Sequence, residues 1–380
     1  MRKDSYTGAG SSGCQVMSSG GGSLNLPPFD LENWLIRCKS ARINLDHSGA
    51  PSPYADGFNP NVDQYDTDDY ELEERLIELI ASTYRIEKEN VALCFGAQNA
   101  NYIAFRATLK SRDLVAIESP TYMPIKVLAT SICKVFDLDR DPSHDFHFSE
   151  KGIEECIRRG AKAVVLTNLH NPSASSLSNE TLMNILEITS RKKIVVICDE
   201  IYREMHYGNP PDPVATLSNN AISVSGLTKL YGLGDLRVGW AIAPPEIASR
   251  INLLRLYIAY RLPARSVAVA IEAIKRRNWF RERMLHIAMR NLVVLKEWLE
   301  KESRVSCKLP QGGLMTLLKL PAEVDDMKFS EYLLDRFSTA VCPGRYFGIK
   351  NHIRVTFSCT TADFKSGLEN ISMALDNFCV

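Results

Sequence analysis

The chain has 380 residues, of which 45% are hydrophobic and 24% charged, proportions typical of a globular protein with a sizeable core. Lys plus Arg and Asp plus Glu are equal at 45 each, which excludes the strongly basic balance of a nucleic-acid-binding or acidic-membrane-binding protein. The 10 cysteines show no CxxC or zinc spacing, and no apolar run is long enough to cross a bilayer. We therefore expect a cytoplasmic protein without a metal site, a nucleic-acid partner or a membrane partner.

The first part of the chain differs from the rest. Residues 1–23 are rich in Gly and Ser and lack the continuous apolar segment of a secretory signal. We expect a disordered leader or an expression remnant there.

Residues 69–113 begin an alternation of helices and strands. Residues 69–86 carry apolar side chains at helical spacing and predict a helix. Residues 90–109 predict a strand, a glycine turn and a helix. Further β-branched runs predict strands within 113–122, 161–173, 192–202, 221–226 and 237–244. Helical stretches lie between several of these runs, which favours a largely parallel sheet covered on both faces.

The C-terminal part predicts a second, smaller unit. Residues 264–302 predict one long helix or two. After them, 312–320, 328–339 and 352–359 alternate between strand, helix and strand. The predicted fold class is α/β, with a large sheet domain and a smaller α/β domain.

Polar residues gather where the predicted strands end. They are Gly96, Gln98, Tyr122, Asn171, Asp199, Tyr202 and Lys229. In open α/β sheets, ligands bind at the carboxyl ends of the strands. Each residue also has an ordinary explanation, such as a turn, a helix cap or a core aromatic, but their common position favours one site.

One end of that site has the features of a phosphate site. "FGAQNA" turns from a strand into a helix, so the backbone N–H groups near Ala97 and Gln98 would form an anion site at a helix N-terminus. Arg237 follows Lys229 by eight positions and could add a permanent positive charge.

The remaining residues match an aromatic ring with an aldehyde. Asp199 could pair with a protonated ring nitrogen, while Asn171 and Tyr202 could bind a phenolic oxygen. Lys229, among small neighbours, could bond to an aldehyde. The ligand that has all of these groups is pyridoxal 5′-phosphate (PLP), which joins enzymes as a lysine Schiff base.

With these motifs the sequence resembles the class I/II aminotransferases, which are fold-type I PLP enzymes. The motifs run in order over residues 24–380: "FGAQNA", "SPTY", "HNPS", "CDEIY", "TKLYGLGDLRVG", "PQGGL", "PGRYFG" and "IRVTFS". The resemblance implies that Lys229 is the Schiff-base lysine and proton shuttle, that Tyr122 stacks on the ring, and that Arg354 grips the substrate carboxylate.

The resemblance also implies a division of the chain and a dimer. Residues 24–65 would form an N-terminal arm and part of the small domain, 66–290 the large PLP-binding domain, and 291–380 the small C-terminal domain. Gly49 resembles the glycine whose backbone approaches the substrate. Tyr65 matches the tyrosine that reaches the phosphate of the neighbouring subunit, which implies a homodimer with its active site at the interface.

One position departs from the family pattern. A serine that binds the phosphate usually stands three residues before the lysine, where this chain has Gly226. Ser225 or Thr228 is expected to replace it.

The function that this resemblance implies is PLP-dependent transfer of an amino group between an α-amino acid and a 2-oxo acid. "LPPFDLENWL" and the ending "PGRYFG…IRVTFSC" also resemble the capreomycidine-synthase branch, which eliminates at the β-carbon and closes a ring. A third alternative is a PLP-fold sensor without catalysis. The sequence does not identify the substrate side chain, although Arg255, Arg261 or Arg265 could meet an acidic one.

Overall fold

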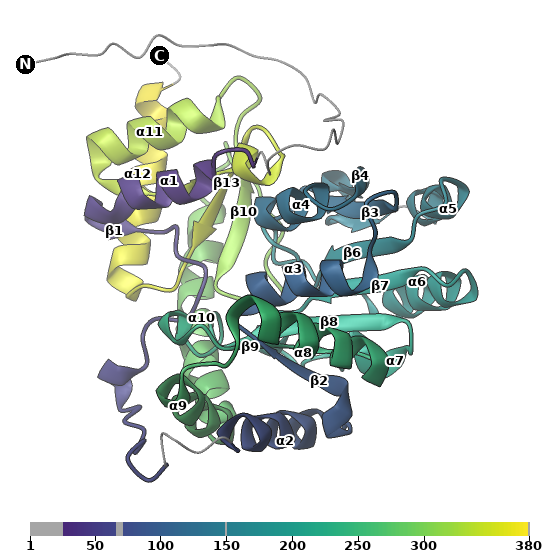
Figure 1. Cartoon of the computed structure of the whole chain (residues 1–380). Helices are drawn as coiled ribbons and strands as arrows, with labels where there is room; N and C mark the ends of the chain where they lie inside the picture. Colours follow the sequence, from purple (N-terminus) through teal and green to yellow (C-terminus); the bar gives the residue numbers. More distant parts are fainter. Residues whose placement is uncertain (1–25, 66–70, 149, 379–380) are drawn as a thin grey trace, which may run out of the picture.

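A computed structural model describes residues 26–65, 71–148 and 150–378, so the predicted leader at 1–23 lies outside the described residues. The larger part of the fold is an eight-stranded sheet in the order β2-β9-β8-β7-β6-β3-β4-β5 (Figure 1). Its strands are β2 (Val91–Cys94), β3 (Leu114–Ser119), β4 (Lys134–Asp141), β5 (His147–Phe148), β6 (Ala163–Thr167), β7 (Val195–Asp199), β8 (Ala221–Gly226) and β9 (Gly239–Ile242). Five adjacent strands, β8, β7, β6, β3 and β4, are parallel to one another. Strand β9 is antiparallel to both of its neighbours, β2 and β8.

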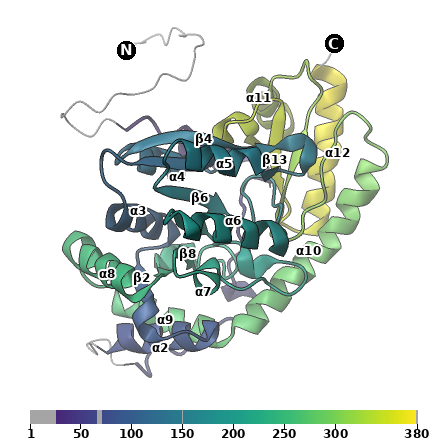
Figure 2. The ribbon, with the colours of Figure 1, turned by 90° about the vertical axis from the view of Figure 1, so that its right-hand side faces the viewer.

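Helices cover both faces of this sheet, which confirms the predicted fold class. One face packs against α3 (Ala97–Thr108), α4 (Met123–Thr130) and α8 (Pro245–Ala259). The other packs against α5 (Glu150–Arg158), α6 (Asn179–Arg191) and α7 (Val214–Leu217). All five residues of β6 are buried, as expected for a parallel strand that is covered on both sides. Figure 2 shows these layers from the side.

The predicted helix at 69–86 is α2 (Leu72–Tyr84), and the predicted long helix at 264–302 is two helices, α9 (Ala264–Lys275) and α10 (Arg277–Leu299). The predicted strand at 237–244 begins only at Gly239, because Arg237 has a left-handed backbone (φ 55°) that a strand cannot contain. Among the described residues, no helix is both long and apolar enough to span a membrane.

A smaller unit packs beside the large sheet. Its antiparallel sheet contains β10 (Met315–Lys319), β12 (Cys342–Pro343) and β13 (His352–Thr356), and the helices α11 (Asp326–Phe337) and α12 (Thr361–Phe378) lie next to it (Figure 1). The N-terminal arm joins this unit: β1 (Ile43–Asn44) pairs in parallel with β11 (Thr339–Ala340), and α1 (Asp30–Arg37) packs against β12. The arm thus brings residues 44–50 between the two sheets. The domain boundaries at residues 65 and 290 stay a prediction.

Candidate active site

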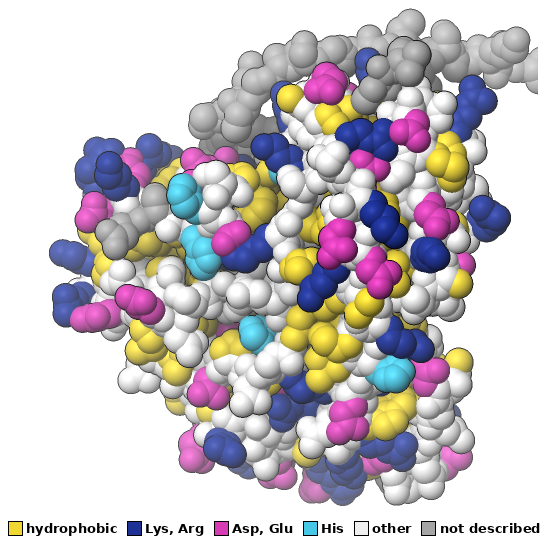
Figure 3. Space-filling model, turned by 180° about the vertical axis from the view of Figure 1, so that it is seen from behind, with side chains coloured by type: hydrophobic (Ala, Val, Ile, Leu, Met, Phe, Trp, Pro, Cys, Tyr) yellow, Lys and Arg dark blue, Asp and Glu magenta, His cyan; other side chains and the backbone are white. Residues whose placement is uncertain are grey.

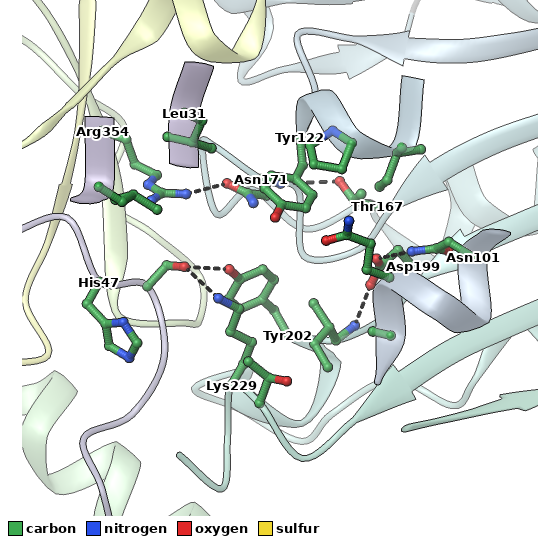
Figure 4. A pocket seen from close by; sticks show the side chains of 18 of the residues that line it. Leu31, His47, Asn101, Tyr122, Thr167, Asn171, Asp199, Tyr202, Lys229 and Arg354 are labelled. Atoms are coloured by element: carbon green, nitrogen blue, oxygen red, sulfur yellow. Dashed lines mark hydrogen bonds between the residues drawn. The ribbon is translucent and has the colours of Figure 1, made fainter. Parts of the chain in front are cut away.

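A cavity of about 500 Å³ lies at the carboxyl ends of the parallel strands, between the large sheet and the smaller unit. Figure 4 shows Asp199, at the end of β7, and Lys229, in the loop after β8, on one side of the cavity, whereas Arg354 approaches from β13 on the opposite side. Ten of the predicted site residues line the cavity: Ala97, Gln98, Tyr122, Asn171, Asp199, Tyr202, Thr228, Lys229, Arg237 and Arg354. The structure therefore brings together residues that are up to 257 positions apart in the sequence (97 to 354).

The phosphate end has unpaired donors. Helix α3 follows Gly96, whose φ of 82° permits the sharp turn out of β2, and no side chain caps the helix. The guanidinium of Arg237 lies beside this turn, where it donates only long hydrogen bonds to the carbonyl oxygens of Gly234 (3.3 Å) and Phe95 (3.4 Å). In the described part of the chain it forms no ion pair with a carboxylate. A dianionic phosphate would satisfy both the helix N-terminus and this charge.

Close packing explains the glycine at 226. Gly226 stands opposite Gly239 at the end of β8, and a Cβ at 226 would lie 2.9 Å from the carbonyl oxygen of Val238. The Ser225 side chain points to the opposite face of the sheet from α3, because side chains alternate along a strand. Ser225 is not among the cavity residues, whereas Thr228 is. Of the two expected replacements, Thr228 is therefore the one in a position to act.

Asp199 is a buried carboxylate that forms no ion pair within the described part of the chain. Its side chain receives hydrogen bonds from Asn101 Nδ2 (2.7 Å) and the backbone N–H of Ile201 (3.0 Å) and is 6% exposed. Burial raises the pKa of Asp199 above its usual value, and these two hydrogen bonds only partly oppose that effect. A cation at the cavity side would offset the cost of burial, so the carboxylate fits a protonated ring nitrogen.

Lys229 and Tyr202 meet at a third residue that the sequence did not indicate. The Nζ of Lys229 donates to Ser48 Oγ (3.0 Å), which lies 2.8 Å from Tyr202 Oη (Figure 4). Nζ also lies 5.6 Å from the centre of the Tyr202 ring. The amine is thus held at the cavity, as a reaction with an aldehyde there requires.

Arg354 is 3% exposed and faces the cavity from the smaller unit. Its Nη1 donates to Asn171 Oδ1 (3.1 Å) and its Nη2 to the backbone oxygen of Asp46 (2.9 Å), while its buried Nε has no hydrogen-bond partner among the described residues. A guanidinium with an unused donor suits a carboxylate ligand.

The predicted residues Gly49 and Tyr65 also lie outside the cavity lining. A Cβ on Gly49 would lie 3.1 Å from the backbone oxygen of Thr228, so the arm passes close to the backbone that carries Lys229. Tyr65 does not reach the cavity: its Oη donates to Glu272 (2.6 Å) and receives a hydrogen bond from Lys275 (3.0 Å).

Sequence reasoning missed several cavity residues, of which Asn101, Ser48 and His47 contact or neighbour predicted ones. Asn101 follows Ala97 by four positions, so a polar residue on the inner face of α3 was a usable signal. For Ser48 the only signal was its place next to Gly49. Desolvation and the nearby charges of Lys229 and Arg354 lower the pKa of His47 to about 4, so its imidazole is neutral at pH 7.

The chain is similar to known proteins in sequence and in fold. A family model described as aminotransferase class I and II matches residues 59–371. Capreomycidine synthase from Streptomyces vinaceus is 27% identical, over 94% of this chain and 96% of its own. A probable N-acetyl-LL-diaminopimelate aminotransferase from Bacillus subtilis is 27% identical over 76% and 74% of the two chains. The crystal structure of a PLP-dependent aminotransferase from Streptococcus suis has a TM-score of 0.86 at 22% identity and covers 93% of this chain and 98% of that one.

Proposed function

The chain belongs to the aminotransferase class I and II family, and from that premise we propose how its residues carry out the reaction. The enzyme is a PLP-dependent aminotransferase that moves an amino group between an α-amino acid and a 2-oxo acid. The observation that supports the assignment most is the position of Lys229 between an anion site on one side and the buried Arg354 on the other.

The cavity residues fit PLP. Ala97, Gln98 and Arg237 would hold its phosphate, and Thr228 is the hydroxyl proposed to replace the family's serine, because this chain has Gly226 at that position. Asp199 would pair with its ring nitrogen. When bound, PLP supplies an aldehyde for the amino group and a cationic ring that accepts electrons from the Cα–H bond.

The second set of ring contacts comes from three residues. Tyr122 would stack on the ring, and Asn171 and Tyr202 would bind its phenolic oxygen. Asn171 already accepts a hydrogen bond from Arg354, so the same side chain links the cofactor side of the cavity to the substrate side.

The protein's own part in catalysis is to bind the substrate and move a proton. Arg354 would bind the α-carboxylate in a bidentate pair and so orient the substrate Cα–H bond within the cavity that Lys229 also lines. Nζ of Lys229 is the base in a position to take the α-proton and hold it for return. The negative charge of Asp199 would stabilise the protonated ring nitrogen of the cofactor.

Elimination with ring closure is the second candidate. The similarity to capreomycidine synthase over nearly the whole of both chains favours it. The removal of the α-proton is common to both reactions, so the residues described above serve either one.

A half-reaction screen tests the proposal. Each amino acid is added to the purified, PLP-loaded protein while the visible absorbance is followed. Transamination predicts that at least one α-amino acid bleaches the absorbance and that a 2-oxo acid restores it. Elimination predicts a spectrum that recovers without any 2-oxo acid. A spectrum that no amino acid changes would contradict both candidate reactions. The remaining alternative would then be a PLP-fold sensor without catalysis.

A homodimer is the proposed assembly. The end of α8 exposes Leu253, Leu256, Tyr257 and Ile258, of which Tyr257 is 84% exposed, and a second subunit would cover them. In such a dimer Tyr65 would reach the phosphate of the neighbouring subunit, and Gly49 would approach the substrate. Sedimentation of the full chain checks this, and a monomer at micromolar concentration would contradict it.

The proposed partners are small molecules in the cytoplasm. On the face in Figure 3, side chains of both charge signs are interspersed, which offers no broad field for a nucleic acid or an anionic membrane. The described cysteines are unpaired, as in a reducing compartment. Fractionation of producing cells tests the compartment, and recovery of the protein with membranes or outside the cell would contradict it.

A further inference from the structure

Ser48 lies on a segment of the arm that is fixed at both ends. On one side, Leu45 N–H donates to the backbone oxygen of Ala340 (2.8 Å), which continues the pairing of β1 with β11. On the other, Ala50 N–H donates to the backbone oxygen of Lys229 (2.7 Å). Ser48 is 5% exposed, so its hydroxyl is held in a defined place at the cavity wall.

The hydroxyl contacts two residues that the proposed reaction uses. Ser48 Oγ accepts from Lys229 Nζ (3.0 Å) and forms a second hydrogen bond with Tyr202 Oη (2.8 Å). Among the described residues, Ser48 is the one hydrogen-bond partner of the Lys229 amine. A lysine side chain is long and flexible, so without this contact the packing of its stem alone would orient the amine.

The direction of the first hydrogen bond has a chemical consequence. A neutral amine has one lone pair, and that lone pair must point at the α-proton for Lys229 to act as a base. When Lys229 donates an N–H to Ser48, its lone pair is left free for the cavity. Tyr202 is held by the same hydroxyl, so the amine and the phenol keep a fixed relative position.

We propose that Ser48 is a positioning residue that aims the Lys229 amine, first at the cofactor aldehyde and then at the substrate α-proton. This inference rests on the proposed function, since it needs both an aldehyde and an α-proton at the site. It assigns a role to a residue of the arm, which is distant in sequence from Lys229, Asp199 and Arg354.

The first test uses the protein before it is loaded. PLP is mixed with the apo-protein, and covalent capture is followed by visible absorbance. Ser48→Ala is expected to slow capture roughly two- to tenfold, the loss typical of one hydrogen bond between neutral groups. Binding of 4′-deoxypyridoxine 5′-phosphate, which has no aldehyde, is expected to change much less than capture does, because Ser48 touches only one of the proposed ring contacts, Tyr202.

Ser358→Ala is the matched control. Ser358 Oγ donates to the backbone oxygen of His47 (2.7 Å), so its loss loosens the same arm segment without touching Lys229. This variant is expected to capture PLP at the wild-type rate. Ser48→Thr, which keeps a hydroxyl, is expected to recover most of the rate that Ser48→Ala loses. If Ser48→Ala does not fold, Ser48→Cys replaces it in the comparison. A cysteine sulfur is only a weak acceptor, so this variant is also expected to capture PLP more slowly than wild type.

The second test follows the loaded enzyme with α-deuterated amino acid. Loss of the aimed amine is expected to lower kcat, leave KM unchanged and increase the kinetic isotope effect. Equal capture by Ser48→Ala and wild type, or an equal loss in Ser358→Ala, would overturn the role of Ser48. Failure of wild type itself to capture PLP would instead overturn the proposed function.

Discussion

Replacing Asp199 with alanine is expected to lower kcat by roughly 10²–10³ or more, because removing a preorganised electrostatic contact typically costs that much. Without the carboxylate the ring nitrogen of the cofactor loses the charge that keeps it protonated. The free energy of unfolding should change far less. Burial raises the pKa of Asp199, so the charged carboxylate is already disfavoured in the folded protein and its removal costs little stability. Steady-state kinetics and thermal unfolding of the same preparation separate the two effects.

Asp326→Ala is the control for the loss of a buried acid. Asp326 is 1% exposed in α11, and its carboxylate accepts from the backbone N–H of Arg345 (2.9 Å), outside the cavity lining. This variant is expected to lose stability and keep its kcat. If Asp199→Ala folds, binds PLP and turns over within a few-fold of wild type, Asp199 has another role.

Replacing Arg354 with lysine is expected to reduce kcat/KM strongly for every α-amino acid. Lysine keeps the charge but has no planar fork of donors, and a carboxylate needs two parallel N–H groups for a bidentate pair. We expect a loss of roughly tenfold or more, as for a hydrogen bond to a charged group. Amines without a carboxylate should react at nearly unchanged rates, because they make no use of the contact.

The structure adds a control to this experiment. Arg354 also binds Asn171 and the backbone of Asp46, so the substitution could loosen the cofactor side of the cavity. PLP affinity and visible absorbance of the variant are therefore measured beside its kinetics. Weaker PLP binding, or an equal loss with simple amines, would place Arg354 among the cofactor contacts and contradict its substrate role.

The sequence predicted the large sheet and most of the cavity because both depend on local patterns. Buried strands such as β6 and β7 appear as continuous apolar runs. Asn171, which follows β6, and Asp199, which ends β7, therefore lie together at the carboxyl ends of parallel strands. The family resemblance then supplied Arg354, which no strand-end argument could connect with Lys229.

The rest depended on contacts that no local pattern contains. Ser48 reaches Lys229 only because β1 pairs with β11, nearly 300 positions away in the sequence. The choice between Ser225 and Thr228 required the sheet face on which Ser225 lies and the lining of the cavity. Tyr65 stays a prediction, since its role needs a second subunit.

The central claim is that Lys229 binds the cofactor covalently, and borohydride reduction tests it most directly. The PLP-loaded protein is reduced and digested, and its peptides are mapped by mass spectrometry. We predict a single pyridoxyl group on Lys229 and none on the Lys229→Ala variant. A label on another lysine, or no visible absorbance after PLP is added to the wild-type protein, would contradict the account.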